Sequence, residues 1–186
     1  MAATIQILRL CGVAGATTTD ITSINTRANT TDAHSTNDTS YPIKIPSTPG
    51  TNYSYWVSTR LNCTVSPVGT VNNVRWFTDG TGSFGTGVTC KVAKASTGAN
   101  AGYRQAVGTA GETGTQLSQA NHTGLDGAPA DAFGKTAAAP LALVGTISNP
   151  TTGEFGDFVV YQIEVDQTAG TGATTAETIS FKYDET

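Results

Sequence analysis

Apolar and polar residues alternate over short stretches in much of the chain. The clearest stretch is 52–63, in which mostly apolar or aromatic residues occupy the odd positions from Tyr53 to Cys63. The even positions are mostly polar, although Trp56 is among them. A period of two is typical of a β-strand with one buried face. We therefore predict a strand over residues 52–63.

Further strands are predicted where β-branched and aromatic residues recur between clusters of Gly, Pro, Asn and Ser. They cover residues 3–11, 20–24, 71–78, 88–94, 140–148, 157–166 and 176–184. Residues 103–107 are a weaker candidate, and Pro42 and Pro46 allow 41–46 no more than an edge strand. No helical periodicity extends beyond two turns. The pattern therefore predicts an all-β fold.

Length and composition favour one domain. The chain has 186 residues, which suits a single ordinary domain, and 38% of them are hydrophobic. Thr is the most frequent residue, and its β-branched side chain suits a half-buried pleated surface. We therefore expect residues 1–186 to form a single-domain antiparallel β-sandwich, for which a jelly roll is one candidate arrangement.

Two long stretches lack a strand pattern. Residues 25–50 contain few large apolar side chains, and residues 108–139 are rich in Gly, Ala and Thr. A long polar loop in a compact domain is usually functional or disordered. We expect about 25–50 to be a polar extended arm or loop, ordered mainly by a neighbouring subunit, and 108–139 to be mostly loop. The Gly-rich residues 79–87 and the linker 167–175 are expected to be hairpin loops.

The charge of the chain argues against two classes of partner. Only 13% of the residues are charged, the net charge is −4, and Lys and Arg are scattered singly. Neutralising phosphates requires clustered basic side chains, so we expect no nucleic-acid binding. No apolar run is long enough to span a bilayer, so no membrane association is expected.

The first residues bear on where the protein acts. Residues 1–12 do not resemble a signal peptide, because Arg9 interrupts the apolar stretch and no basic region precedes it. The Thr-, Asn- and Gly-rich composition is nevertheless typical of an exposed, extracellular surface. A virion protein made in the host cytoplasm reconciles these two observations, so the virion is the expected location.

Three cysteines, Cys11, Cys63 and Cys90, occur without the spacing of a metal site. Cys63 and Cys90 each share a strand face with apolar residues, as small buried hydrophobes do. We expect Cys63 to be buried and reduced. A disulfide between Cys63 and Cys90 is the alternative, and it depends on a geometry that the sequence does not supply.

Residues 80–85 spell G-x-G-x-x-G and superficially resemble the glycine-rich loop of protein kinases. The context differs, because Gly87 stands where that loop has valine and no H-R-D or D-F-G segment is present. A dinucleotide site would require a helix after the glycines, whereas a strand is predicted there. We interpret the motif as a turn between strands and expect no cofactor.

Few titratable residues suggest chemistry. His122 and Asp126 could bind a metal or act as a base, but no second His or Cys lies near them in sequence. Glu154 and Asp157 flank a turn, which favours solvated carboxylates. We therefore expect no catalytic residue and no metal site, and predict that the protein is not an enzyme.

The two tryptophans are the candidate contact residues. By simple alternation Trp56 and Trp76 point to the polar side of their strands. An exposed aromatic pair could stack on a sugar or contact a protein partner. The alternative is that both side chains pack in a core or against another subunit.

Three segments carry a resemblance to known proteins. In their overall residue pattern, residues 52–61, 74–92 and 155–184 resemble virion structural proteins of tailed phages and environmental viruses, of the small β-sandwich kind. The resemblance implies a head or tail surface role such as capsid decoration, and it transfers no site residue.

Two functional hypotheses follow. The first is a non-enzymatic virion structural protein, most simply a capsid decoration protein, whose partners are its own copies or the major capsid protein. A symmetric homo-oligomer, of which a trimer is one form, would cover exposed strand edges that few Lys and Glu guard. The second is a carbohydrate-binding module that uses Trp56 and Trp76. A hydrolase is the weakest alternative.

Overall fold

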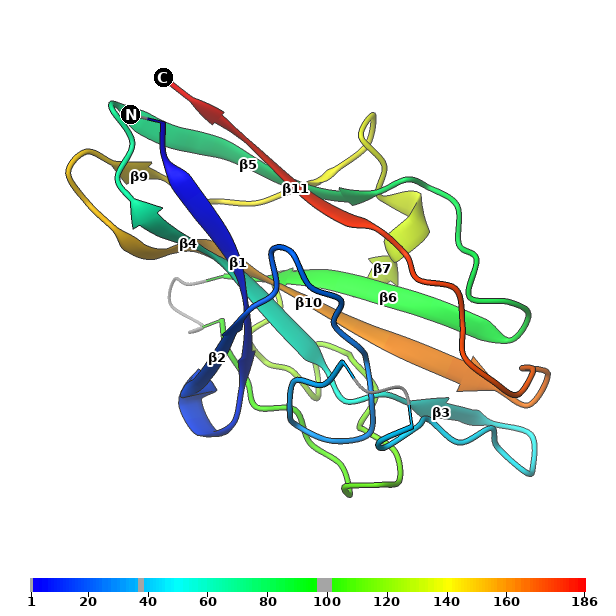
Figure 1. Cartoon of the computed structure of the whole chain (residues 1–186). Coiled ribbons are helices and arrows are strands. Elements are labelled where there is room, and N and C mark those ends of the chain that lie inside the picture. The colour runs from blue at the N-terminus through cyan, green and yellow to red at the C-terminus, as the bar shows by residue number, and fades with distance from the viewer. Residues whose placement is uncertain (1, 37–38, 97–101) are drawn as a thin grey trace.

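The computed structural model describes residues 2–36, 39–96 and 102–186, and it shows two antiparallel β-sheets packed face to face (Figure 1). The helical residues in these ranges are two single 3₁₀ turns, η1 (Val13–Gly15) and η2 (Ala132–Gly134). The predicted all-β sandwich is confirmed.

The larger sheet has seven strands. Their order is β2 (Thr17–Asp20), β1 (Thr4–Cys11), β4 (Val57–Val65), β10 (Gly153–Asp166), β6 (Val88–Ala95) and β7 (Ala130–Asp131), with β3 (Thr51–Tyr53) also paired to β10. The smaller sheet has the order β11 (Ile179–Glu185), β5 (Thr70–Thr78) and β8 (Leu141–Ala142), with β9 (Ile147–Ser148) also paired to β5. This division into seven and four strands differs from the eight-stranded jelly roll, so only the sandwich is assigned.

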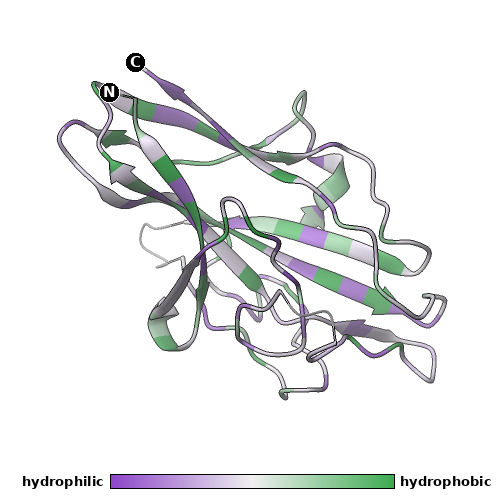
Figure 2. Ribbon diagram, in the orientation of Figure 1, coloured by the Kyte–Doolittle hydropathy of each residue, from purple (hydrophilic) through white to green (hydrophobic). Residues whose placement is uncertain are grey.

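The main core lies between the sheets. The larger sheet contributes alternate residues of its central strands, such as Val57 and Leu61 on β4 and Val159 on β10. The smaller sheet contributes Val71 and Trp76 of β5 to the same cluster. The alternation is visible in Figure 2, where hydrophobic residues recur between hydrophilic ones along β6 and β10. A period of two therefore selects the face of each strand that is buried.

A second core covers the outer face of the larger sheet. Phe158 and Val160 of β10 and Leu8 of β1 pack there with Leu117 and Leu125, which come from the long segment between β6 and β7. Strand β10 is thus buried on both faces, since Val159 and Val160 are each 0% exposed. The molecule therefore has three layers: the smaller sheet, the larger sheet, and irregular chain outside it.

The predicted strand 52–63 is two strands joined by a bulge. Val57 lies opposite Tyr161 and Tyr53 opposite Glu164, which leaves three residues on one strand against two on the other. The backbone N–H of Tyr55 donates to the carbonyl of Asn29 instead of to a neighbouring strand. An extra residue reverses the alternation of faces. Tyr55 and Trp56 therefore both join the second core, whereas the sequence pattern placed them on opposite faces.

Other predicted strands are shorter or absent. The stretch 20–24 is represented by β2, which ends at Asp20, and 140–148 holds only the two-residue strands β8 and β9. Residues 41–46 and 103–107 form no strand. Strand β10 begins at Gly153, ahead of the predicted residue 157.

The two predicted hairpins are connections between sheets. Strand β5 pairs with β11 in the smaller sheet, and β6 pairs with β10 in the larger one. The loops β5–β6 and β10–β11 therefore both cross the edge of the sandwich at the same place. They touch there, because the backbone N–H and the hydroxyl of Ser83 both donate to the carboxylate of Glu177. The G-x-G-x-x-G motif is part of this crossing and not of a hairpin.

The three cysteines are free and buried. Cys63 is 1% exposed, which confirms the prediction of a buried, reduced thiol and contradicts a disulfide with Cys90. Burial raises the pKa of the Cys90 thiol to about 12 and also raises the pKa of Cys63. These thiols therefore pack in the core as small apolar side chains and are poor nucleophiles at neutral pH.

Truncation of Val159 should test the double burial of β10. We expect Val159→Ala to lower the free energy of unfolding by about 2–3 kcal/mol, because the surrounding layers leave a cavity that they cannot fill. The exposed Val68 offers the matched control, and Val68→Ala should change stability by less than about 0.5 kcal/mol. Urea unfolding followed by circular dichroism measures both. Equal losses in the two variants would contradict the packing described.

Candidate functional site

The third layer is the most unusual part of the molecule, and we call its outer surface the loop face. It is formed by the turn 12–16, the described parts of segment 26–42, and residues 102–126, which lie below the larger sheet in Figure 1. Its chain contains no strand, and its contacts with the sheet include single bridges such as Ala95 to Leu125. Irregular backbone of this length needs hydrogen-bond partners that a regular ladder does not supply.

Gln162 anchors residues 115–117 from the middle of β10. This side chain is 0% exposed, and its amide Nε2 donates to the carbonyl oxygens of Ser54 and Thr115 at 2.7 and 2.8 Å. Its Oε1 accepts the backbone N–H of Leu117 at 2.6 Å. A buried amide that uses both N–H donors and its carbonyl oxygen supplies the partners that a sheet would otherwise supply to this backbone. One polar residue in an apolar strand therefore fixes the loop.

Arg9 anchors segment 26–33 in the same way. Its side chain is almost fully buried, with the residue 1% exposed, and it donates to the hydroxyl of Thr26 at 2.7 Å. The same guanidinium donates to the carbonyls of Arg27 at 2.6 Å and Ala33 at 3.0 Å. A guanidinium has five donors and matches several carbonyls at once, which suits it to organise a loop.

The segment expected to be a free arm is therefore bound to its own domain over much of its length. Thr30 is 0% exposed, its N–H donates to the carbonyl of Tyr41, and its own carbonyl accepts from Gly111. Asp32 accepts from the backbone N–H of Gly12 and from the side chain of Gln105. The described residues of 25–50 form a loop, and buried polar groups of their own domain replace the missing apolar contacts. Ordering of this segment by a neighbouring subunit stays a prediction. Residues 37–38 lie outside the described part.

The predicted contact residues Trp56 and Trp76 are both buried, but they lie in different cores. Trp56 is 5% exposed in the second core, and its indole N–H donates to the carbonyl of Thr115 at 2.8 Å. Trp76 is 0% exposed between the sheets. A bulge at Asn73, where φ is 52°, turns Trp76 inward. Neither side chain is placed to stack on a sugar or a partner, and core packing is the role the structure gives them.

His122 lies against Trp56 and is separate from Asp126. The two rings are 5.0 Å apart between centroids, His122 is 0% exposed, and neither ring nitrogen has a partner among the described residues. Burial lowers the pKa of this imidazole to about 4, and the positive charge of Arg104 contributes in the same direction. Asp126 instead lies 3.7 Å from the ammonium of Lys94. The two residues thus form no common site.

Glu154 and Asp157, expected as solvated turn carboxylates, differ in environment. Glu154 pairs with Arg60 at 3.2 Å in a partly exposed position. Asp157 is buried, accepts the backbone N–H of Val144 at 2.7 Å, and lies 3.6 Å from Lys94. The expectation is wrong for Asp157, because β10 already begins at Gly153, so Asp157 lies within the strand on the same inward face as Phe155 and Val159. No group of three or more His, Cys, Asp or Glu side chains in the described part could hold a metal.

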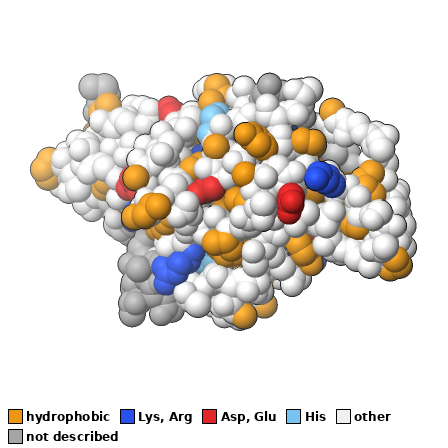
Figure 3. Space-filling view, turned by 90° about the horizontal axis from the view of Figure 1, so that it is seen from below, with side chains coloured by type: hydrophobic (Ala, Val, Ile, Leu, Met, Phe, Trp, Pro, Cys, Tyr) orange, Lys and Arg blue, Asp and Glu red, His pale blue; other side chains and the backbone are white. Residues whose placement is uncertain are grey.

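The loop face presents apolar side chains on a surface of low charge. Val13, Tyr41 and Val107 are 75%, 47% and 47% exposed. Figure 3 shows this side of the molecule, with scattered hydrophobic side chains among neutral groups and few charged ones. Rigid, weakly charged surfaces lose little entropy and little hydration when they bind, so this face is suited to contact with another protein. No local sequence pattern indicated it.

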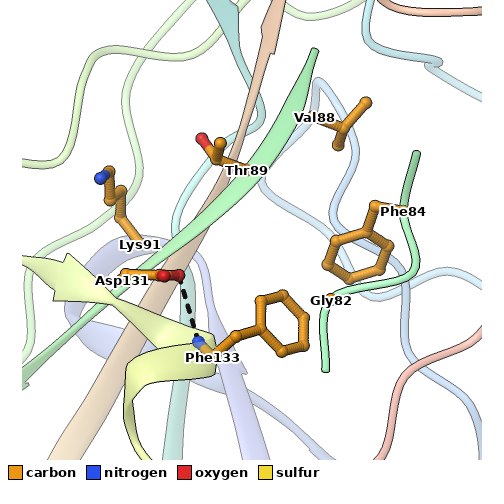
Figure 4. A pocket seen from close by; sticks show the side chains of 7 residues that line it. All are labelled: Gly82, Phe84, Val88, Thr89, Lys91, Asp131 and Phe133. Atoms are coloured by element: carbon orange, nitrogen blue, oxygen red, sulfur yellow. Dashed lines mark hydrogen bonds between the residues drawn. The ribbon is translucent and has the colours of Figure 1, made fainter. Parts of the chain in front are cut away.

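A hollow of about 310 Å³ opens at the β6–β7 edge of the sandwich. Phe84 and Phe133 meet edge to face at 5.6 Å, and Asp131 accepts the backbone N–H of Phe133 (Figure 4). Thr89 and Lys91 of β6 complete its polar side. The hollow could accept a small ring with polar substituents. Its residues are distant in sequence, so only the fold brings them together.

No protein-family model, curated protein or solved structure matches the chain. Within the described residues, no helix has the length and apolar character needed to cross a membrane.

Loss of the Arg9 guanidinium should release segment 26–33. We expect Arg9→Met to lower the free energy of unfolding by about 2 kcal/mol or more and to speed tryptic cleavage after Arg27, because the carbonyls it held lose their donor. Cleavage sites can be read by mass spectrometry of the native digest. Arg60→Met, which alters another guanidinium, should leave Arg27 protected. Unchanged cleavage after Arg27 in the Arg9 variant would contradict the anchoring role.

The pH dependence of stability should report the buried His122. Between the ordinary pKa near 6.5 and the native value of about 4, the unfolded chain binds a proton that the native state does not. Stability should therefore fall as the pH is lowered through this window. In His122→Phe this contribution disappears, so the variant should gain at least about 1 kcal/mol relative to the wild type between pH 7 and pH 4. A constant difference measured by urea unfolding would show that His122 is not buried in its neutral form.

Proposed function

We propose that the protein is a non-enzymatic structural protein of a virion, acting on the particle surface as a capsid decoration or comparable component. Its partners in this proposal are its own copies or the major capsid protein. The observation that carries the proposal is the loop face, where Gln162 holds irregular chain in place by hydrogen bonds and apolar groups remain exposed. The resemblance of three segments to virion proteins supports the same assignment.

The physical cost of using this face is low. Its backbone is already ordered by the domain, so binding need not immobilise it. Its groups are mostly neutral, so few charges must lose water on contact. Val13 and Val107 supply apolar area that a partner would cover. These features support binding by shape and apolar contact and give no support to steering by charge.

Strand edges support self-association. In the described part, β11 pairs on one side with β5 only, and β2 pairs only with β1. Unpaired edges offer backbone donors and acceptors to another copy of the chain. A cyclic homo-oligomer, of which a trimer is one form, would cover them symmetrically.

Carbohydrate binding is the second candidate, and the hollow at the β6–β7 edge favours it. Phe84 and Phe133 could contact the apolar face of a sugar ring, while Lys91 and Asp131 could bond its hydroxyls. This site replaces Trp56 and Trp76, which are buried.

A double substitution on the loop face should separate the two candidates. We expect Val13→Asp with Val107→Asp to weaken self-association, or binding to particles that carry the chain, at least about tenfold, because charge is placed in an apolar contact. Light scattering and co-sedimentation measure these effects. Val68→Asp, on the turn between β4 and β5, is the matched control and should bind normally.

Two other outcomes of these measurements would contradict the structural role or favour glycan binding. A stable monomer that binds no particle would overturn the structural role. Glycan binding by that monomer, lost in Phe84→Ala, would establish the second candidate instead.

A further inference from the structure

Lys94 lies between two aspartates at the edge of the inter-sheet core. Its Nζ is 3.6 Å from Oδ2 of Asp157 and 3.7 Å from Oδ2 of Asp126. Lys94 is on β6, on the same face as Val92 of the main core, and Asp157 is on the neighbouring β10. Because Lys94 lies opposite Val159, Asp157 is its diagonal neighbour two residues away. The register of the sheet therefore holds the amine and the carboxyl together.

The surroundings disfavour a simple ion pair. The side chain of Asp157 is 3% exposed, while those of Lys94 and Asp126 are each 28% exposed. Burying a charged pair costs more hydration than burying a neutral group of the same size, unless the pair is well hydrogen-bonded. Asp157 also accepts a hydrogen bond from the backbone N–H of Val144, which lies 2.7 Å from its Oδ2. A neutral link between the same atoms would remove the cost of both charges.

We propose that Lys94 and Asp157 join in an intramolecular isopeptide bond, with Asp126 relaying the proton. The Asp126 carboxylate takes a proton from the Lys94 ammonium, and the free amine attacks the carbonyl carbon of the Asp157 carboxyl group. A C–N bond forms and a C–O bond breaks. The three ammonium protons are divided between the amide N–H and the departing water, so atoms and charge balance without an oxidant or a cofactor.

The local geometry suits this step. The N–H of Val144 already donates to Oδ2, where negative charge develops when the amine adds to the carboxyl group. The Lys94 Nζ lies 3.6 Å from Oδ2 of Asp157, so the amine is held beside the carboxyl group that it would attack. A small hollow lined by Lys94, Asp126 and Leu141 opens beside them and gives the water a way out. The bond would covalently tie β6 to β10 and is independent of either proposed function.

The mass of the intact chain tests the proposal directly. Under denaturing conditions the purified full chain should weigh one water molecule less than its sequence, and a proteolytic fragment should contain the Lys94 and Asp157 peptides joined. Lys94→Arg and Asp157→Ala should each restore the full sequence mass. Asp126→Asn should leave a large uncrosslinked fraction, because it cannot take the proton. Full sequence mass in the wild type would overturn the proposal even if a variant failed to fold.

Two controls exclude other origins of the mass loss. Lys135 borders the same hollow, and Lys135→Arg should still lose one water. A cyclic imide at Asp126 and Gly127 would also release water, but its loss would persist in Lys94→Arg. Persistence there would overturn the proposal, and complete crosslinking in Asp126→Asn would overturn the role assigned to that carboxylate.

Discussion

Burial of β10 on both faces is the constraint on which the rest of the structure depends. One face of this strand is covered by the smaller sheet, but the other has no third sheet to cover it. Irregular chain from residues 102–126 supplies that cover, with Leu117 and Leu125 as its apolar contacts. Because irregular backbone cannot satisfy itself through a regular ladder, its carbonyls and N–H groups need partners elsewhere.

A small set of buried polar side chains provides those partners. Gln162 satisfies residues 115–117 and Arg9 satisfies segment 26–33, each through several bonds at once. This arrangement explains how a chain with few charges and many threonines orders so much loop. The two anchors act on opposite faces of the larger sheet: Gln162 lies beneath the loop face, whereas Arg9 lies on the inner face, with Ile7.

The two groups of side chains to which we assign binding or bond formation as proposals lie where the layers end. The Phe84 and Phe133 hollow and the Lys94, Asp126 and Asp157 group both lie where β6 meets the chain that leads into the smaller sheet. At such an edge side chains from both sheets meet while solvent still has access. An amine and a carboxyl can therefore be held together without full burial, and a ring can be accepted without opening the core. The loop face, in contrast, offers shape and apolar area only.

The sequence by itself determined the strand-rich class, the location of the main strands, and the apolar role of Cys63, because these depend on local alternation. It could not show that the outer face, to which alternation assigns Trp56, is covered by chain distant in sequence, and it could not assign the face of Trp76. A bulge adds a residue and reverses the alternation, and the partner strand that stabilises the bulge is distant in sequence. Nor could it pair β5 with β11 in place of β6, since consecutive strands with a Gly-rich turn suit a hairpin equally well. The roles of Arg9, Gln162 and Lys94 were likewise decided by the tertiary structure alone, because a buried polar group acquires its function from the groups that the sheet order brings to it.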